Sequence, residues 1–225
     1  MSNTKHTVND ILQIMADVRG ESSVDVSSKR IRMVSRAEKD FARRTFWRTH
    51  LIKDQTVVGT AANDYDLGSA TYPFRPKGLT EVLVATTGDS PTQKYSIVDF
   101  NNFKDLYVGN SYEYMVYEWY DVANDKWKMH INPAPAITET ITYSHYWEPP
   151  TRTTSSDAVI CPNPKIIALL ALADLAHSED EMQTEQLLKN EAEQLIAELI
   201  GLENTPAVNQ TYSMGAIEGQ GIGSY

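Results

Sequence analysis

The sequence contains one cysteine, Cys161, and no long apolar run. A single cysteine excludes an intrachain disulfide bond. The longest apolar run, Ile166–Leu175, contains Asp174 and is too short to cross a bilayer. Residues 1–6 contain no apolar segment of the kind that a secretory signal needs, so we expect synthesis in the cytoplasm.

Recognisable catalytic motifs are also missing. We find no phosphate-binding glycine loop, HExxH, GxSxG or CxxC motif, and the histidines lack metal-ligand spacing. Cys161 precedes an expected helix, whose N-terminus could lower a thiol pKa, but a buried structural cysteine is the favoured interpretation. The oxygen-rich stretch 63–66 lacks the glycine and closing glutamate of an EF-hand, which favours a turn over a calcium site. We therefore expect no enzyme activity, cofactor or metal.

Charge is unevenly distributed along the chain. The net charge of −10 argues against a surface that wraps nucleic acid. Basic residues nevertheless gather between positions 29 and 48, whereas acidic residues dominate positions 164–203. A solvated helix face is one interpretation of the basic residues. Pairing with the acidic C-terminal helices, within the chain or between subunits, is another, and phosphate binding is the least favoured.

Hydrophobic periodicity predicts helices at both ends of the chain. Thr7 can cap a first helix that Gly20 interrupts, and a second should run from about Ser27 to Trp47. Asn163-Pro164 begins a third helix that is apolar nearly all round, which indicates burial. A fourth helix should end at a C-cap, Gly201.

Between the helices the period changes from about 3.6 to 2, which is typical of strands. Residues 72–76 contain two prolines and predict a loop, and Ala123-Asn124-Asp125 predicts a hairpin turn. The fold class is therefore α+β. We expect residues 1–52 and 158–201 to form a helical bundle, residues 53–157 an inserted antiparallel β-domain, and residues 202–225 an extended glycine-rich arm that buries too little apolar surface to order itself.

The strand region is rich in Tyr and Trp. Along Tyr112–Tyr120 both strand faces carry rings, so one face could be exposed. Cross-strand packing is the favoured interpretation. The alternative is a carbohydrate- or protein-binding β-module of a surface protein, with Trp119 and Trp127 as stacking residues.

The order of these segments resembles the head-to-tail adaptor (connector) proteins of tailed bacteriophages, including the tail tubular protein A type. The resemblance covers about residues 7–200. It rests on the basic-aromatic end of the second helix at 41–47, Gly59-Thr60 with Tyr65-Asp66-Leu67, the strand at 79–84, the Pro-x-Pro turn at 133–135, the segment Tyr143–Pro150, and Asp157 before the C-terminal helices.

The resemblance implies a structural virion protein at the portal vertex. It implies a homo-oligomeric ring, typically twelvefold, that contacts the portal and the tail or nozzle proteins, with genome DNA passing through its lumen and no membrane involved. The candidate residues for subunit or portal contacts are Arg32, Arg36, Lys39, Arg43, Arg44, Glu185, Glu193, Tyr212, Met214, Ile217, Ile222 and Tyr225.

Overall fold

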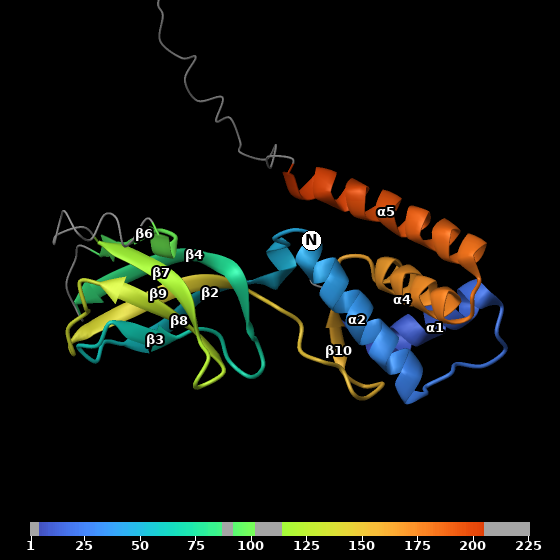
Figure 1. Cartoon of the computed structure of the whole chain (residues 1–225), viewed down its shortest axis with the longest axis horizontal. Helices are drawn as coiled ribbons and strands as arrows, with labels where there is room; N and C mark the ends of the chain where they lie inside the picture. Colours follow the sequence, from blue (N-terminus) through green and yellow to red (C-terminus); the bar gives the residue numbers. More distant parts are fainter. Residues whose placement is uncertain (1–4, 87–91, 102–113, 205–225) are drawn as a thin grey trace, which may run out of the picture.

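The computed structural model describes residues 5–86, 92–101 and 114–204. It combines helices with largely antiparallel sheets, which confirms the predicted α+β class (Figure 1). Helices lie at one end of the elongated molecule and most strands at the other. The candidate contact residues Tyr212, Met214, Ile217, Ile222 and Tyr225 lie outside the described residues.

The N-terminal helices are α1 (Val8–Arg19) and α2 (Ser28–Arg44). As predicted, Thr7 caps α1: its hydroxyl accepts from Asp10 N, and the Asp10 carboxylate accepts from Thr7 N at 2.7 Å. Gly20 ends α1 in a left-handed conformation (φ 68°), which glycine adopts without strain. The chain then continues through a short 3₁₀ turn, η1 (Arg48–His50).

The C-terminal helices are α4 (Pro164–Ser178) and α5 (Met182–Asn204). Asn163 caps α4 and Pro164 occupies its first turn, as the sequence predicts. α4 is buried nearly all round because α1, α2 and α5 all pack on it. In Figure 1, α5 runs above α4, away from α1.

Within the part of the chain that the structure describes, the strands form three sheets. A two-stranded sheet pairs β1 (Lys5–Thr7) with β10 (Ala158–Ile160) beside the helices. A second sheet has the order β2-β9-β4-β5, and a third has the order β3-β8-β7-β6. Their bounds are Leu51–Val58 (β2), Asp64–Asp66 (β3), Phe74–Thr86 (β4), Gln93–Lys94 (β5), Ser96–Ile97 (β6), Met115–Asp121 (β7), Lys126–Asn132 (β8) and Glu139–Trp147 (β9). The predicted turn at 123–125 joins β7 to β8, and β6 runs parallel to β7.

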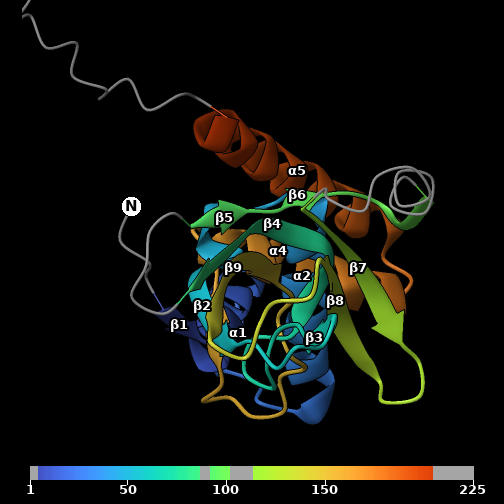
Figure 2. The ribbon, with the colours of Figure 1, turned by 90° about the vertical axis from the view of Figure 1, so that its left-hand side faces the viewer.

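The described residues form two hydrophobic cores. One lies among α1, α2, α4 and α5 and includes Phe41, Trp47 and Ile167. The other lies between the two four-stranded sheets and includes Val82, Met129 and Ile141. Figure 2 shows these two sheets from the strand end of the molecule, with the helices behind them.

Arg75 joins the two cores. Its Nη1 donates to the carbonyl oxygens of Ala42 and Thr45 at 2.6 Å each, and its Nη2 donates to Arg43 O at 3.0 Å. The guanidinium also lies 4.3 Å from the centre of the Phe46 ring. Arg75 therefore satisfies the free carbonyls at the end of α2 from the first residues of β4.

Three sequence-based boundaries are wrong. α2 ends at Arg44 rather than Trp47, because the backbone adopts an extended conformation at Thr45. β4 begins at Phe74 within the predicted loop: Pro76 lies in an irregular stretch between the Phe74↔Trp147 and Leu79↔His145 pairs. α5 continues to Asn204, so Gly201 is not its C-cap. A glycine inside a helix costs about 1 kcal/mol relative to alanine, which the helix tolerates.

Candidate subunit interface

Four basic residues of α2 lie in a line along its exposed side: Arg32, Arg36, Lys39 and Arg43. We call this line the basic stripe. Steps of three or four residues keep them on one face of the helix. The opposite sides of α2 are covered, since Ile31, Val34, Glu38 and Phe41 are buried. The stripe is therefore the side of α2 that a partner could reach.

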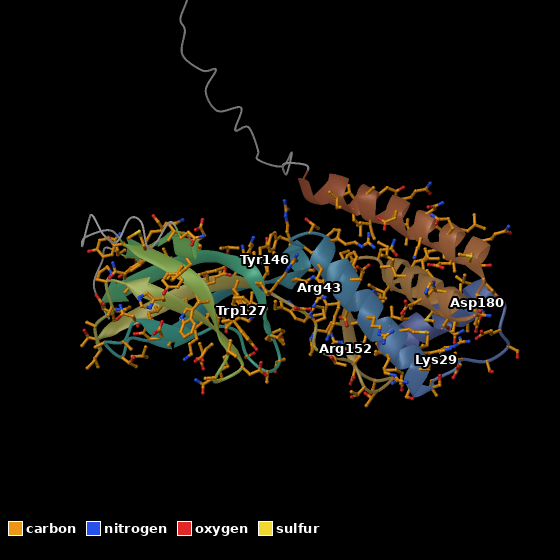
Figure 3. The ribbon with its side chains drawn as sticks, viewed as in Figure 1. Lys29, Arg43, Trp127, Tyr146, Arg152 and Asp180 are labelled. Atoms are coloured by element: carbon orange, nitrogen blue, oxygen red, sulfur yellow. The ribbon has the colours of Figure 1, made fainter. Side chains whose placement is uncertain are left out.

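Partners within the chain neutralise the basic stripe only weakly. Arg36 reaches Asp174 Oδ2 at 3.7 Å and its side chain is 75% exposed. Arg43, which Figure 3 marks on α2, contacts Glu148, and its side chain remains 64% exposed. Lys39 Nζ donates to Thr151 Oγ1 at 2.8 Å, and Arg32 Nε donates to Ser28 O at 3.2 Å. Exposed pairs of this kind contribute about 0–1 kcal/mol each, so the positive charge stays available.

The other charged candidates pair within the chain. Arg44 turns toward α5, where it forms ion pairs with Asp40 and Glu193. Glu185 accepts from Lys189 Nζ at 2.5 Å and lies 3.0 Å from His177 Nδ1. These two hydrogen bonds, Lys189 first, lower the pKa of Glu185. The structure thus brings Arg44 and Glu193 together inside one subunit, as the intrachain alternative predicts.

A groove of about 210 Å³ lies between α2, α4 and α5, beside the basic stripe. Its apolar floor consists of Met33, Ala37, Leu170 and Ala173. Arg36, Asp174 and Glu193 are among the charged residues of its rim. The sequence pattern does not predict this floor, because the helix that contains Leu170 and Ala173 is apolar nearly all round and is therefore expected to be covered on all sides.

The outer face of the β3-β8-β7 sheet carries the aromatic residues that suggested ligand binding. The Tyr117 and His130 rings stack with centroids 5.0 Å apart, and Trp119 Nε1 donates to Asp64 Oδ1 at 3.1 Å. Lys128 Nζ lies 5.6 Å from the Trp119 ring centre. On the other face, Trp127 packs against Phe74 and Tyr120. These aromatic rings therefore contact one another and neighbouring charged side chains. Sugar binding by this face stays a prediction.

Cys161 is buried, with 2% of its surface exposed, and its thiol donates to Asn163 O at 3.1 Å. Burial raises the pKa of the thiol to about 12. The expected burial of Cys161 is therefore confirmed, and a protonated thiol is a poor nucleophile.

Among the described residues, no group of three His, Cys, Asp or Glu side chains is placed to hold a metal ion. Asp64 and Asp66, which suggested calcium, instead contact His130 and Lys126. Within the same residues, no helix has the length and apolar character that a bilayer span requires.

A comparison with protein families finds a match that spans most of the chain. The family model described as SU10 adaptor protein matches residues 8–215, which is most of the chain and includes both hydrophobic cores. No match was found among curated proteins. The chain therefore belongs to the SU10 adaptor protein family, which confirms its resemblance to phage head-to-tail adaptors.

Proposed function

We propose that this chain is a structural component of the virion neck. Its copies form a homo-oligomeric ring of twelvefold symmetry between the portal and the tail. Genome DNA passes through the lumen of this ring without specific binding. The family match supports the adaptor role, and the net charge of −10 per subunit suits a lumen along which DNA moves without adhering.

We propose that the two ends of the molecule contact different partners. Residues 1–52 and 158–201 form the helical unit that contacts neighbouring subunits and the portal, and residues 53–157 form the β-unit that contacts tail or nozzle proteins. Residues 205–225, which follow α5, form an arm that contacts a partner. In support, the described residues bury one apolar core among the helices and another between the sheets.

The observation that carries the proposal is the incompletely neutralised basic stripe of α2. A chain of net charge −10 keeps four cations on one accessible helix face, and the Arg36–Asp174 pair spans 3.7 Å. Such a face suits a repeating contact with an acidic surface, which steers association and fixes orientation.

Assembly with the portal tests the proposal. The purified full-length chain is mixed with the portal oligomer of the same particle, and the mass of the complex is measured by sedimentation. We expect a complex with a fixed number of adaptor copies for each portal ring. Charge reversal at Arg32 and Arg43 should weaken it, whereas Lys53→Glu on β2 serves as a matched control. A chain that stays unbound and monomeric with its portal would contradict the proposal.

A further inference from the structure

The groove between α2, α4 and α5 has an apolar floor and a rim of mixed charge, and the basic stripe of α2 runs along one side of it. Arg36 belongs to both the groove and the basic stripe. Arg32 and Lys39 continue the stripe, and among the described residues no carboxylate pairs with either of them. The basic stripe and the apolar floor beside it therefore suit an amphipathic helix that carries acidic residues beside apolar ones.

The outer face of α1 has this composition. Asp10, Ile14, Asp17 and Val18 fall within about a third of the helix circumference, given 100° for each residue. Asp10 and Asp17 are exposed, Val18 is 44% exposed, and Ile14 is half-buried. The only basic residue of α1 is Arg19 in its last turn, where Glu179 and Glu21 pair with it. An acidic and partly apolar helix face is thus left without a covering element in the described structure.

The carboxylates on the outer face of α1 have the same spacing as the cations of the basic stripe on α2. Asp10 and Asp17 are seven residues apart, as are Arg32 and Lys39, and also Arg36 and Arg43. Seven residues correspond to about 10 Å along a helix. Two carboxylates of α1 can therefore meet two cations of α2 at once when the helices lie side by side.

The two surfaces cannot meet within one chain. α1 packs on α4 with its buried face of Ile11, Leu12 and Met15, and α5 borders the groove from the other side of α4 (Figure 1). A contact between them joins different patches of two copies, which is the head-to-tail geometry that generates rings.

We propose that the α1 face of one subunit, with Asp10, Ile14, Asp17 and Val18, packs into the α2–α4–α5 groove of the next subunit. This inference rests on the proposed ring and names its subunit contact. Val18 and Ile14 cover the apolar floor at Leu170 and Ala173, and Asp17 faces the basic stripe.

Cysteine cross-linking in the full-length chain tests the contact. Val18→Cys and Leu170→Cys are combined in a Cys161→Ala background, and assembled protein is treated with a short bismaleimide. We expect a ladder of covalent multimers that extends to the full ring. A matched variant pairs Val18→Cys with Val58→Cys on β2, which is 63% exposed, and should give no ladder. A ring that forms without cross-links between positions 18 and 170 would overturn this contact and leave the ring proposal intact.

A charge swap provides the second test. Asp17→Lys and Arg36→Glu should each lower the apparent association constant about tenfold at low salt. The double variant should recover most of this loss, and high salt should reduce all three effects because exposed charges are screened. Losses that simply add in the double variant would overturn the contact. Failure of the unmodified chain to form any ring would instead overturn the proposed function.

Discussion

Glu38 of α2 and Arg152 form a buried bidentate ion pair. Arg152 Nε donates to Glu38 Oε2 at 2.7 Å, and Arg152 Nη2 donates to Oε1 at 2.8 Å. Glu38 is fully buried, and its Oε1 also accepts from Ile160 N at 3.2 Å. The pair thus holds the connector after β9 against the helical core, and Figure 3 shows Arg152 beside α2.

Breaking this pair should destabilise the subunit strongly. Arg152→Met leaves the Glu38 carboxylate buried without its cation, and the free energy of unfolding should fall by about 3–5 kcal/mol. Urea unfolding measures this change. Lys53→Met, at an exposed position of β2, is the control and should change stability little. A loss below about 1 kcal/mol for Arg152→Met would show that the pair is not a structural anchor.

Sequence patterns predicted the order of elements better than the contacts between them. Thr7, Gly20 and Asn163 are local signals, and each ends or begins a helix as expected. Glu38 stands at an apolar position of α2, but its partner is 114 residues away, and nothing local points to Arg152. The early end of α2 likewise depends on Arg75, a residue of the β-region.

The candidate contact surface was predictable only in part. The helical period places Arg32, Arg36, Lys39 and Arg43 on one face, and in the structure all of them are exposed except Lys39, which is half-buried. Whether each cation pairs inside the chain depends on how α5 packs, which decides that Arg44 meets Glu193. The apolar groove floor also depends on the spacing of three helices.

Arg75 should couple the two cores. Arg75→Lys removes the planar guanidinium fork, because one ammonium group cannot reproduce hydrogen bonds to three separate carbonyls. We expect a loss of about 1–3 kcal/mol and a broader or split calorimetric transition. Arg32→Lys is the matched control, since that side chain bonds only to Ser28 O of its own helix in the described structure. An unchanged single transition in Arg75→Lys would contradict the coupling.

Stability should fall as the pH drops from about 6.5 to 4. Burial, with Arg75 and Arg152 nearby, lowers the pKa of His50 to about 4, whereas an unfolded histidine titrates near 6.5. The unfolded chain therefore binds the proton more readily in this window, and acid favours unfolding by on the order of 3 kcal/mol. Unfolding curves from pH 4 to 7.5 measure the effect.

His50→Phe should flatten this pH dependence. The substitution keeps an aromatic ring beside Trp147 and removes the titrating group. A smaller slope should remain, because burial also lowers the pKa of His145. Lys53→Met, at an exposed position of β2, is the control and should keep the original slope. An identical pH profile in His50→Phe would exclude His50 as its source.

Removal of residues 205–225 should spare the fold and weaken assembly. The residues that seat α5 on the core, including Leu188, Ala192 and Ile196, all precede the deletion. The thermal unfolding midpoint of the isolated subunit should therefore stay unchanged, while sedimentation should show less complex with the portal. A marked fall in the midpoint would mean that these residues belong to the core.

Imaging the neck of the native particle that contains this chain tests the central claim most directly. The account predicts a ring of identical subunits coaxial with the portal, twelvefold in symmetry, with α1 of each subunit against the α2–α4–α5 groove of the next. A neck in which this chain occurs as a monomer or dimer, or away from the portal axis, would contradict the adaptor ring.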